Sequence, residues 1–337
     1  MIKYIVIALF TISILSAACS NSTEEGYRIE FTLDGEVPKE AYLGYYMNKT
    51  QYVADTTQSN NGTFVFEGDE RLPYGMYILI VPPELKYFDI LMGEDQHFEV
   101  STHSESLMDS LVITNSEVNN EFISYVRFFQ NKQLEKRGIL ALMKEANKEE
   151  VPKLAERLEK LDAEVMDKQE ELIAKYDNTV LSTFIKASLN VQVPEAPDSL
   201  TATEQQEYQF KYYKKHYFDN LELSNPAIIR TPFYATKIDN YFDNLVPRQA
   251  DSLITESEWL IDRSSGNDET YRFMLINLIN RFAHGVTDAE ERAYAHLGLE
   301  YYTDTLKTPW INMEERLNIV ARAQIIDSLQ TLKSLDQ

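Results

Sequence analysis

The sequence of 337 residues contains a single cysteine, Cys19, and only 11 glycines. One thiol cannot form an internal disulfide, a Cys-x-x-Cys redox pair or a thiolate metal site, since each needs at least two. The glycines form no phosphate-binding loop and no Gly-x-Ser-x-Gly motif. These absences exclude dithiol exchange by this chain and give no sign of nucleotide binding or serine hydrolysis.

Positively charged residues are far fewer than negatively charged ones. The chain has 32 Lys and Arg against 54 Asp and Glu, a formal net charge of −22. A surface of this sign repels phosphate groups, so we expect no nucleic acid partner and no attraction to anionic lipid head groups.

Histidine offers little basis for a metal or cofactor site. The chain has 5 histidines, and neither His-x-His nor His-Glu-x-x-His spacing occurs. His284 and His296 are close in sequence, but His284 precedes Gly285, a pattern typical of a helix C-terminus. We therefore expect no metal, no cofactor and no catalytic residues, and hence that the protein is not an enzyme.

The first 19 residues have the layout of a secretory signal. Lys3 provides a positive charge, residues 4–15 are mostly apolar, and small residues lead to Cys19. Leu15-Ser16-Ala17-Ala18-Cys19 resembles the lipobox of bacterial lipoproteins, although Ser16 stands where leucine is commonest. The resemblance implies an acylated Cys19, a short tether at 20–26, and a protein anchored in the cell envelope. The expected location is the outer membrane, on its periplasmic or surface face.

Residues 27–116 have the pattern of a β domain. Several short segments are rich in Val, Ile, Tyr and Phe, and some alternate between apolar and polar residues. Asp34-Gly35 and Asn60-Asn61-Gly62 are typical turn sequences between them. Strands are expected at 27–33, 41–47, 51–56, 63–66, 76–81, 87–92, 97–101 and 111–114. This spacing predicts an antiparallel β-sandwich.

From about residue 117 the apolar spacing becomes helical, so the fold class is α+β with an all-α domain at 117–337. Val151, Leu154, Leu158, Leu161, Val165 and Leu172 follow a heptad spacing that Lys168 interrupts. They predict a long helix that pairs with the preceding segment as an antiparallel helical hairpin. A homodimeric coiled coil is the alternative. Further helices are expected at 180–189, 204–218, 232–245, 248–261, 268–282, 288–302 and 314–335.

Residues 204–218 mix aromatic residues with lysines. Phe210, Tyr213 and Tyr217 share one helical stripe, which predicts an amphipathic core helix with a basic outer edge rather than a ligand-binding face.

A short Asp-(Ser/Thr)-apolar pattern recurs along the chain and resembles the acceptor for O-glycosylation in exported Bacteroidetes proteins. The alternative is that these residues cap helices and begin turns. The candidate acceptors are Thr56, Ser110, Ser199, Ser252, Thr305 and Ser328.

Motifs in both halves resemble one family. The β half contains AYLGYY at 41–46, QYVADT at 51–56, GTFVFEG at 62–68, LPYGMY at 72–77 and KYF at 86–88. The helical half contains ETYRF at 269–273, NRFA at 280–283, AHL at 295–297 and TPW at 308–310. These motifs resemble the domains of unknown function that precede the thioredoxin domain in Bacteroidetes thioredoxin-like oxidoreductase lipoproteins. That family has a Cys-x-x-Cys domain after the last helix, whereas this sequence stops at Gln337.

The sequence therefore favours a non-catalytic, lipid-anchored envelope protein that serves as a binding or scaffold module, with a thioredoxin-like protein as the expected partner. One alternative is the non-redox part of a split thiol-disulfide oxidoreductase. Another is a ligand-binding or hydrolytic lipoprotein with a cleft between its two domains.

Overall fold

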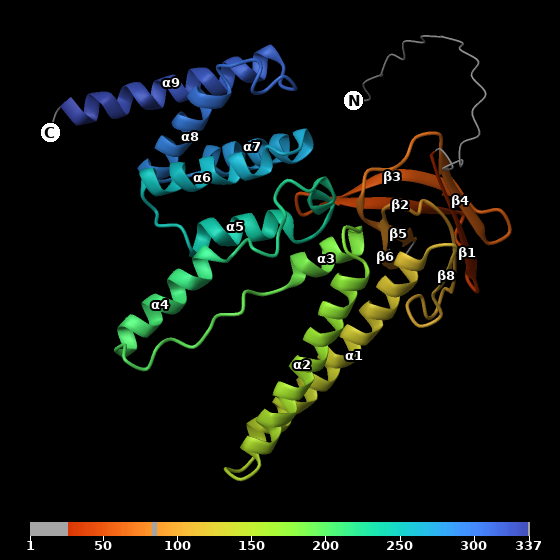
Figure 1. The fold of residues 1–337 in the computed structure, drawn as a ribbon. Coiled ribbons are helices and arrows are strands. Elements are labelled where there is room, and N and C mark those ends of the chain that lie inside the picture. The colour runs from red at the N-terminus through yellow and green to blue at the C-terminus, as the bar shows by residue number, and fades with distance from the viewer. Residues whose placement is uncertain (1–25, 83–85, 336–337) are drawn as a thin grey trace, which may run out of the picture.

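The computed structural model describes residues 26–82 and 86–335 (Figure 1), so Cys19 and the tether up to residue 25 lie outside the described residues. The predicted strands all form, within about two residues of the expected bounds. They are β1 Tyr27–Asp34, β2 Glu40–Met47, β3 Thr50–Gln58, β4 Thr63–Gly68, β5 Gly75–Val81, β6 Lys86–Met92, β7 His97–His103 and β8 Val112–Thr114.

The strands form two sheets, in the orders β4-β1-β7-β8 and β3-β2-β5-β6. The α+β class and the sandwich are confirmed, but the pairing is not antiparallel throughout. β1 and β7 run parallel, with Phe31 opposite Val100. A short hairpin forces neighbouring strands to be antiparallel. The chain instead crosses to the other sheet for β5 and β6 before β7 returns beside β1, so no hairpin fixes the direction of this pair.

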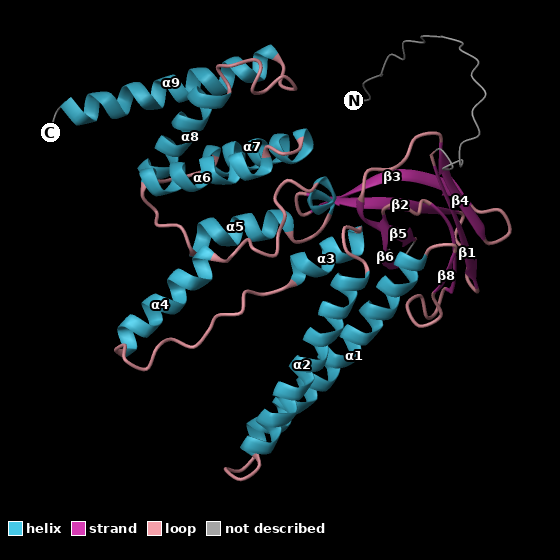
Figure 2. Ribbon diagram, in the orientation of Figure 1, coloured by secondary structure: helices cyan, strands magenta, loops and turns pink. Residues whose placement is uncertain are grey.

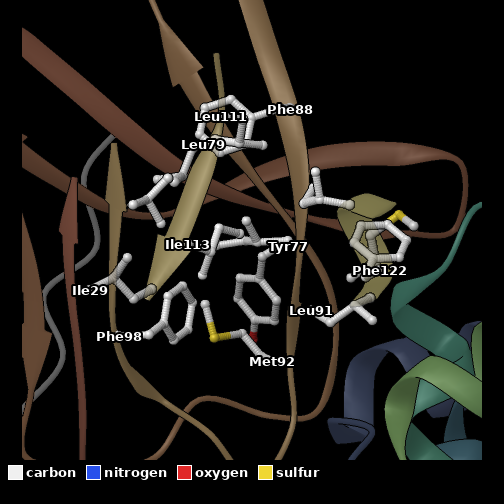
Figure 3. Packing of buried hydrophobic residues seen from close by; sticks show 14 of the residues in the cluster. Ile29, Tyr77, Leu79, Phe88, Leu91, Met92, Phe98, Leu111, Ile113 and Phe122 are labelled. Atoms are coloured by element: carbon white, nitrogen blue, oxygen red, sulfur yellow. The ribbon is translucent and has the colours of Figure 1, made fainter. Parts of the chain in front are cut away.

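The two sheets enclose the first hydrophobic core, and Figure 3 shows part of it. Every second residue of β1 points inward: Ile29, Phe31 and Leu33 are at most 1% exposed, as the alternation in the sequence predicts. The inward side chains of the facing sheet include Leu79 and Phe88. Burial of these large apolar side chains is the main source of stability for the sandwich.

The helical part begins with an arm. Helices α1 Glu117–Glu145 and α2 Val151–Lys175 run antiparallel and extend away from the sandwich (Figures 1 and 2). Lys136 bridges to Asp162 at 2.7 Å, and Lys132 also pairs with Glu164 across the two helices. The predicted helical hairpin is thus present.

Helix α1 is fixed to the edge of the sandwich by one buried amide. Asn119 is 1% exposed; its Oδ1 accepts from the backbone N of Leu91 at 2.7 Å, and its Nδ2 donates to the same residue's O at 2.9 Å. Phe122 packs on Leu91 from the next turn (Figure 3). The amide therefore pairs with backbone groups that the edge strand β6 leaves open.

The remaining elements are α3 Val180–Ser188, α4 Ala202–Lys215, the short 3-10 helix η1 Pro226–Arg230, α5 Tyr234–Asn244, α6 Ala250–Ser264, α7 Asp268–Ala283, α8 Asp288–Tyr301 and α9 Met313–Leu335. Helices α5 to α9 enclose a second core around Leu260, Leu278 and Leu297. The first core crosses the predicted domain boundary at residue 116, because Phe122, Leu172 and Leu181 of α1 to α3 belong to it.

The heptad stripe of α2 is only partly buried, and one helical expectation is wrong. Of the heptad residues in α2, only Leu161 and Leu172 are buried, and Val151 is 37% exposed. The outer part of the arm has two helices only, which cannot cover each other's apolar sides completely. Helix α4 has no buried residue, and Phe210 is 48% exposed. The expected core helix is wrong, because α4 lies at the margin of the second core. Tyr213 packs against that core but is only partly buried, and the segment after the helix, with Tyr217 and Phe218, enters it.

Among the described residues, no helix combines the length and the apolar character that crossing a membrane requires.

Candidate functional site

The sandwich and the second helical core meet at η1. Asn225 caps this short helix by accepting from the backbone N of Ala227 at 3.0 Å, and Pro226 occupies its first position. Ala227 packs into the first core, whereas Ile228 and Ile229 pack into the second. One five-residue helix thus contributes to both cores and sets how the two halves fit together.

An ion pair with a buried cation lies at this junction. The side chain of Arg230 is 7% exposed, and its guanidinium donates to both carboxylate oxygens of Glu269, with Nη1 to Oε2 at 3.2 Å. Glu269 lies in the first turn of α7. Asn267 caps this helix, and its side-chain oxygen accepts a hydrogen bond from the backbone N of Glu269 at 2.9 Å. The pair neutralises the charge of Glu269 and leaves both carboxylate oxygens engaged.

The hairpin between β2 and β3 reaches over to the helices. Its two turn residues, Asn48 and Lys49, have φ angles of 47° and 66°, the left-handed pair of a two-residue turn that asparagine tolerates well. Asn48 Oδ1 accepts from Asn277 Nδ2 at 3.2 Å. Lys49 forms an ion pair with Asp239, whose other oxygen accepts from Arg281 at 2.9 Å. The turn is therefore attached to both α5 and α7.

A cavity of about 380 Å³ lies between this hairpin, η1 and α7. Its apolar wall is formed by Met47, Tyr52, Ile229, Phe273 and Ile276. This is the place between the two domains where the sequence-based alternative expected a cleft. The volume suits a small molecule or a short chain segment.

The polar wall of the cavity contains an exposed arginine and an asparagine with one unpaired amide oxygen. Asn277 Oδ1 is buried and has no hydrogen-bond partner, while the other end of the amide bonds Asn48. Arg272 places its guanidinium 5.9 Å from the ring centre of Trp310. Within residues 26–82 and 86–335, no carboxylate lies at ion-pair distance from Arg272. A buried acceptor without a donor costs about 1–3 kcal/mol, but this oxygen has almost no accessible surface, so it does not face the open space of the cavity.

A larger cavity of about 830 Å³ lies between the arm and α4. Two pairs of its polar side chains contact each other. Lys136 bonds Asp162, and His216 Nδ1 lies 2.6 Å from Asp219 Oδ2. The cavity between the hairpin and α7 lies where the two cores meet and has a mainly apolar wall, so it is the better candidate site.

The histidines behave as structural residues. His284 is the C-cap of α7, as the sequence predicted, and its backbone N donates to Asn280 O at 3.3 Å. His296 Nε2 lies 2.8 Å from Glu258 Oε1. The described part of the chain brings together no group of three His, Cys, Asp or Glu residues that could hold a metal ion.

The candidate glycosylation residues are spread over the surface. Thr56, Ser199, Thr305 and Ser328 are exposed, whereas Ser110 and Ser252 are half-buried. The Ser110 hydroxyl donates to Ser106 O at 2.8 Å and accepts from the backbone N of His103 at 2.9 Å. This hydroxyl already has a structural role in the β7–β8 loop. Modification of the six residues stays a prediction, as does lipidation of Cys19.

The sequence did not single out Arg272, Asn277 or the Asn48-Lys49 turn as a site. The turn itself can be predicted from the sequence, because two polar residues separate two strand-like segments. No local pattern predicts that the cavity residues lie together, since Asn48 and Asn277 are 229 positions apart.

Comparison with known proteins finds no match among curated proteins and none among solved structures. Residues 27–122, from the start of β1 to Phe122 in α1, match the family model described as a domain of unknown function (DUF4369).

Proposed function

We propose that this protein is a lipid-anchored, non-catalytic binding module of the cell envelope, and that it binds a small amphipathic anion in the cavity between the β2–β3 hairpin and α7. The observation that supports this most is an arginine without a carboxylate partner beside an apolar wall. Arg272 is exposed, lines the cavity and pairs with no carboxylate among the described residues.

The complementary ligand has two features. It has an apolar body for the wall of Tyr52, Phe273 and Ile276, and an anionic group for Arg272. An acid with a hydrophobic group near its carboxylate has this combination. The anchor rests on the lipobox-like sequence that ends at Cys19.

Binding is a better fit to this cavity than hydrolysis. The carboxylate in its lining, Glu269, accepts from the guanidinium of Arg230 through both oxygens. A general base needs a free oxygen within reach of the proton that it removes. Glu269 is therefore better suited to positioning Arg230 than to activating water.

The thioredoxin-like partner and the split thiol-disulfide oxidoreductase rest on the family resemblance of the motifs at 41–88 and 269–310. The matched domain of unknown function agrees with the β part of that resemblance. A pull-down from intact envelope that recovers a Cys-x-x-Cys protein would support this partner.

The binding proposal is tested with two fluorescent probes that differ in charge. Anilinonaphthalene sulfonate is an apolar anion, and phenylnaphthylamine has a similar apolar body without the sulfonate. We expect the protein to bind the anion more tightly than the neutral probe. The variant Ile276→Trp, which fills the cavity, should reduce binding of both. Equal binding by wild type and Ile276→Trp would refute this site.

A further inference from the structure

The last helix, α9, has a wide apolar face that the rest of the chain leaves uncovered. Met313, Leu317, Ile325, Leu329 and Leu332 are between 53% and 64% exposed. The opposite face of the helix packs on α8 and neighbouring helices through Ala323, Ile326 and Arg316, which are at most 8% exposed. Figure 1 shows α9 at the outer edge of the helical part.

This face carries no charge along most of its length. Between Leu317 and Leu332 its other exposed residues are the uncharged Asn318, Ala321, Gln324, Ser328 and Thr331. Of the charged residues in the same stretch, Asp327 lies on another side of the helix, and Arg322 borders the face and turns toward Ala283 O and the Tyr294 ring. In a chain with a net charge of −22, an exposed helix is expected to present charged residues to water. An uncharged stripe of this length is typical of a contact surface.

The charges at the two ends of α9 indicate what kind of helix fits against it. The first turn contains Glu314 and Glu315, and the last turn contains Lys333. Glu315 and Lys333 are eighteen residues apart, which is five full turns at 3.6 residues per turn, so they lie along the same edge of the helix. An antiparallel second α9 places Glu315 beside the other copy's lysine at both ends, whereas a parallel one places like charges together.

The apolar residues also suit an antiparallel copy. The midpoint between Glu315 and Lys333 is Gln324. If a two-fold axis passes there, Leu317 of one copy falls between Leu329 and Leu332 of the other, and the two Ile325 side chains meet next to the axis. The apolar side chains of the two helices then alternate along the contact, as in knobs-into-holes packing.

We propose that α9 pairs with α9 of a second copy of this chain, antiparallel and about a two-fold axis near Gln324. Lys333 contacts Asp288 at 2.8 Å within one chain, but both side chains are more than half exposed. Such a surface pair contributes little, so it does not oppose the new contact. A single pair of helices lies near the lower end of stable interfaces, about 1,200 Å² in total, so we expect micromolar affinity.

The dimer and one predicted modification exclude each other. Ser328 lies within the apolar face, and its hydroxyl donates to Gln324 O at 2.7 Å. A glycan on Ser328 would occupy the space of the second helix. The test therefore uses protein whose intact mass shows no added sugar.

The test is thiol cross-linking in envelope preparations that contain the full chain. It compares Glu315→Cys, Lys333→Cys and the double variant, treated with a short bifunctional thiol reagent. Along one helix the two positions are about 27 Å apart at 1.5 Å per residue, too far for a bond within one copy. We expect the double variant to form a species of twice the mass and each single variant to stay monomeric. Wild type, with Cys19 alone, is the background control.

Packing is tested in the same double-cysteine chain. Adding Ile325→Glu should abolish the cross-link, whereas Leu306→Glu, at a residue 86% exposed outside α9, should leave it unchanged. Both sites are exposed, so circular dichroism should show a folded chain in each case. Cross-linking by the single variants would overturn the antiparallel arrangement. A missing cross-link, or one to a different protein, would overturn the self-association.

Discussion

Gly75 at the start of β5 and Arg230 at the end of η1 lie so close that a β-carbon on Gly75 would sit 2.4 Å from Arg230 Cβ. Gly75 also has a φ of +153°, which side chains rarely adopt. These two residues bring the sandwich and the helical part into direct contact. The cavity beside them exists because this approach fixes η1 and α7 against the hairpin.

Gly75→Ala should therefore weaken the junction. We expect a loss of about 2 kcal/mol or more in the free energy of unfolding, from backbone strain and displacement of Arg230. Urea unfolding followed by circular dichroism measures it. The matched control is Gly138→Ala in α1, where an added β-carbon has no neighbour within 4 Å; it should stabilise by about 0.5–1 kcal/mol. Equal effects of the two changes would show that the close approach at Gly75 is unimportant.

The Arg230–Glu269 pair should respond unequally to loss of either partner. Arg230 is 7% exposed and Glu269 is 40% exposed at the side chain. Glu269→Gln leaves a buried cation without its anion and should cost about 3 kcal/mol. Arg230→Met leaves a carboxylate that water reaches and should cost about 1 kcal/mol.

The double variant of this pair should be more stable than Glu269→Gln alone, because it removes the uncompensated cation. Chemical unfolding of the three variants gives the comparison. If Arg230→Met proved the more damaging single change, burial would not control the energetics of the pair.

Asp89 on β6 should make stability fall as pH rises. Burial raises the pKa of Asp89 to about 6, while a hydrogen bond from Tyr46 acts weakly in the opposite direction. Between about pH 4 and 6 the folded chain keeps a proton that the unfolded chain has lost, so stability decreases with rising pH across this window. Asp89→Asn removes that dependence.

We expect Asp89→Asn to match wild type in stability below about pH 4 and to exceed it above about pH 6, by about 3 kcal/mol at most. The measurement is urea unfolding of both proteins at several pH values, taking the difference at each. A difference that does not change with pH would contradict the assigned pKa.

Cys19→Ser tests the anchor. If Cys19 carries the lipid, the wild-type chain should be recovered from the membrane fraction with an intact mass increased by acyl groups. The serine variant should be recovered without them and lose membrane association. A wild-type mass equal to the unmodified polypeptide would contradict lipidation.

Local patterns predict much more of this fold than of its site. Ile29, Phe31 and Leu33 alternate in sequence, and the structure buries all three, because a strand at a sheet surface requires that period. Helix α4 shows the limit. Phe210 lies on an apolar stripe, yet it is 48% exposed because no element covers that end of the helix. Periodicity tells which residues share a face but not whether another element packs on it.

The cavity depends on contacts that no local pattern contains. Helix η1 lines one side of the cavity, and its five residues are too few to show a helical spacing of apolar residues. The cavity walls come from a hairpin turn and a helix that lie 229 positions apart at Asn48 and Asn277. Arg272 lies beside an apolar wall only when these segments meet.

The most direct test of the proposed function is the affinity for anilinonaphthalene sulfonate of Arg272→Ala, compared with Arg137→Ala at an exposed position on the arm. Removing the cavity cation should weaken this probe about 3- to 10-fold, equivalent to about 1 kcal/mol, and leave phenylnaphthylamine binding unchanged. Arg137→Ala should bind both probes as wild type does. If Arg272→Ala binds the anionic probe as tightly as Arg137→Ala, the cavity is not an anion site.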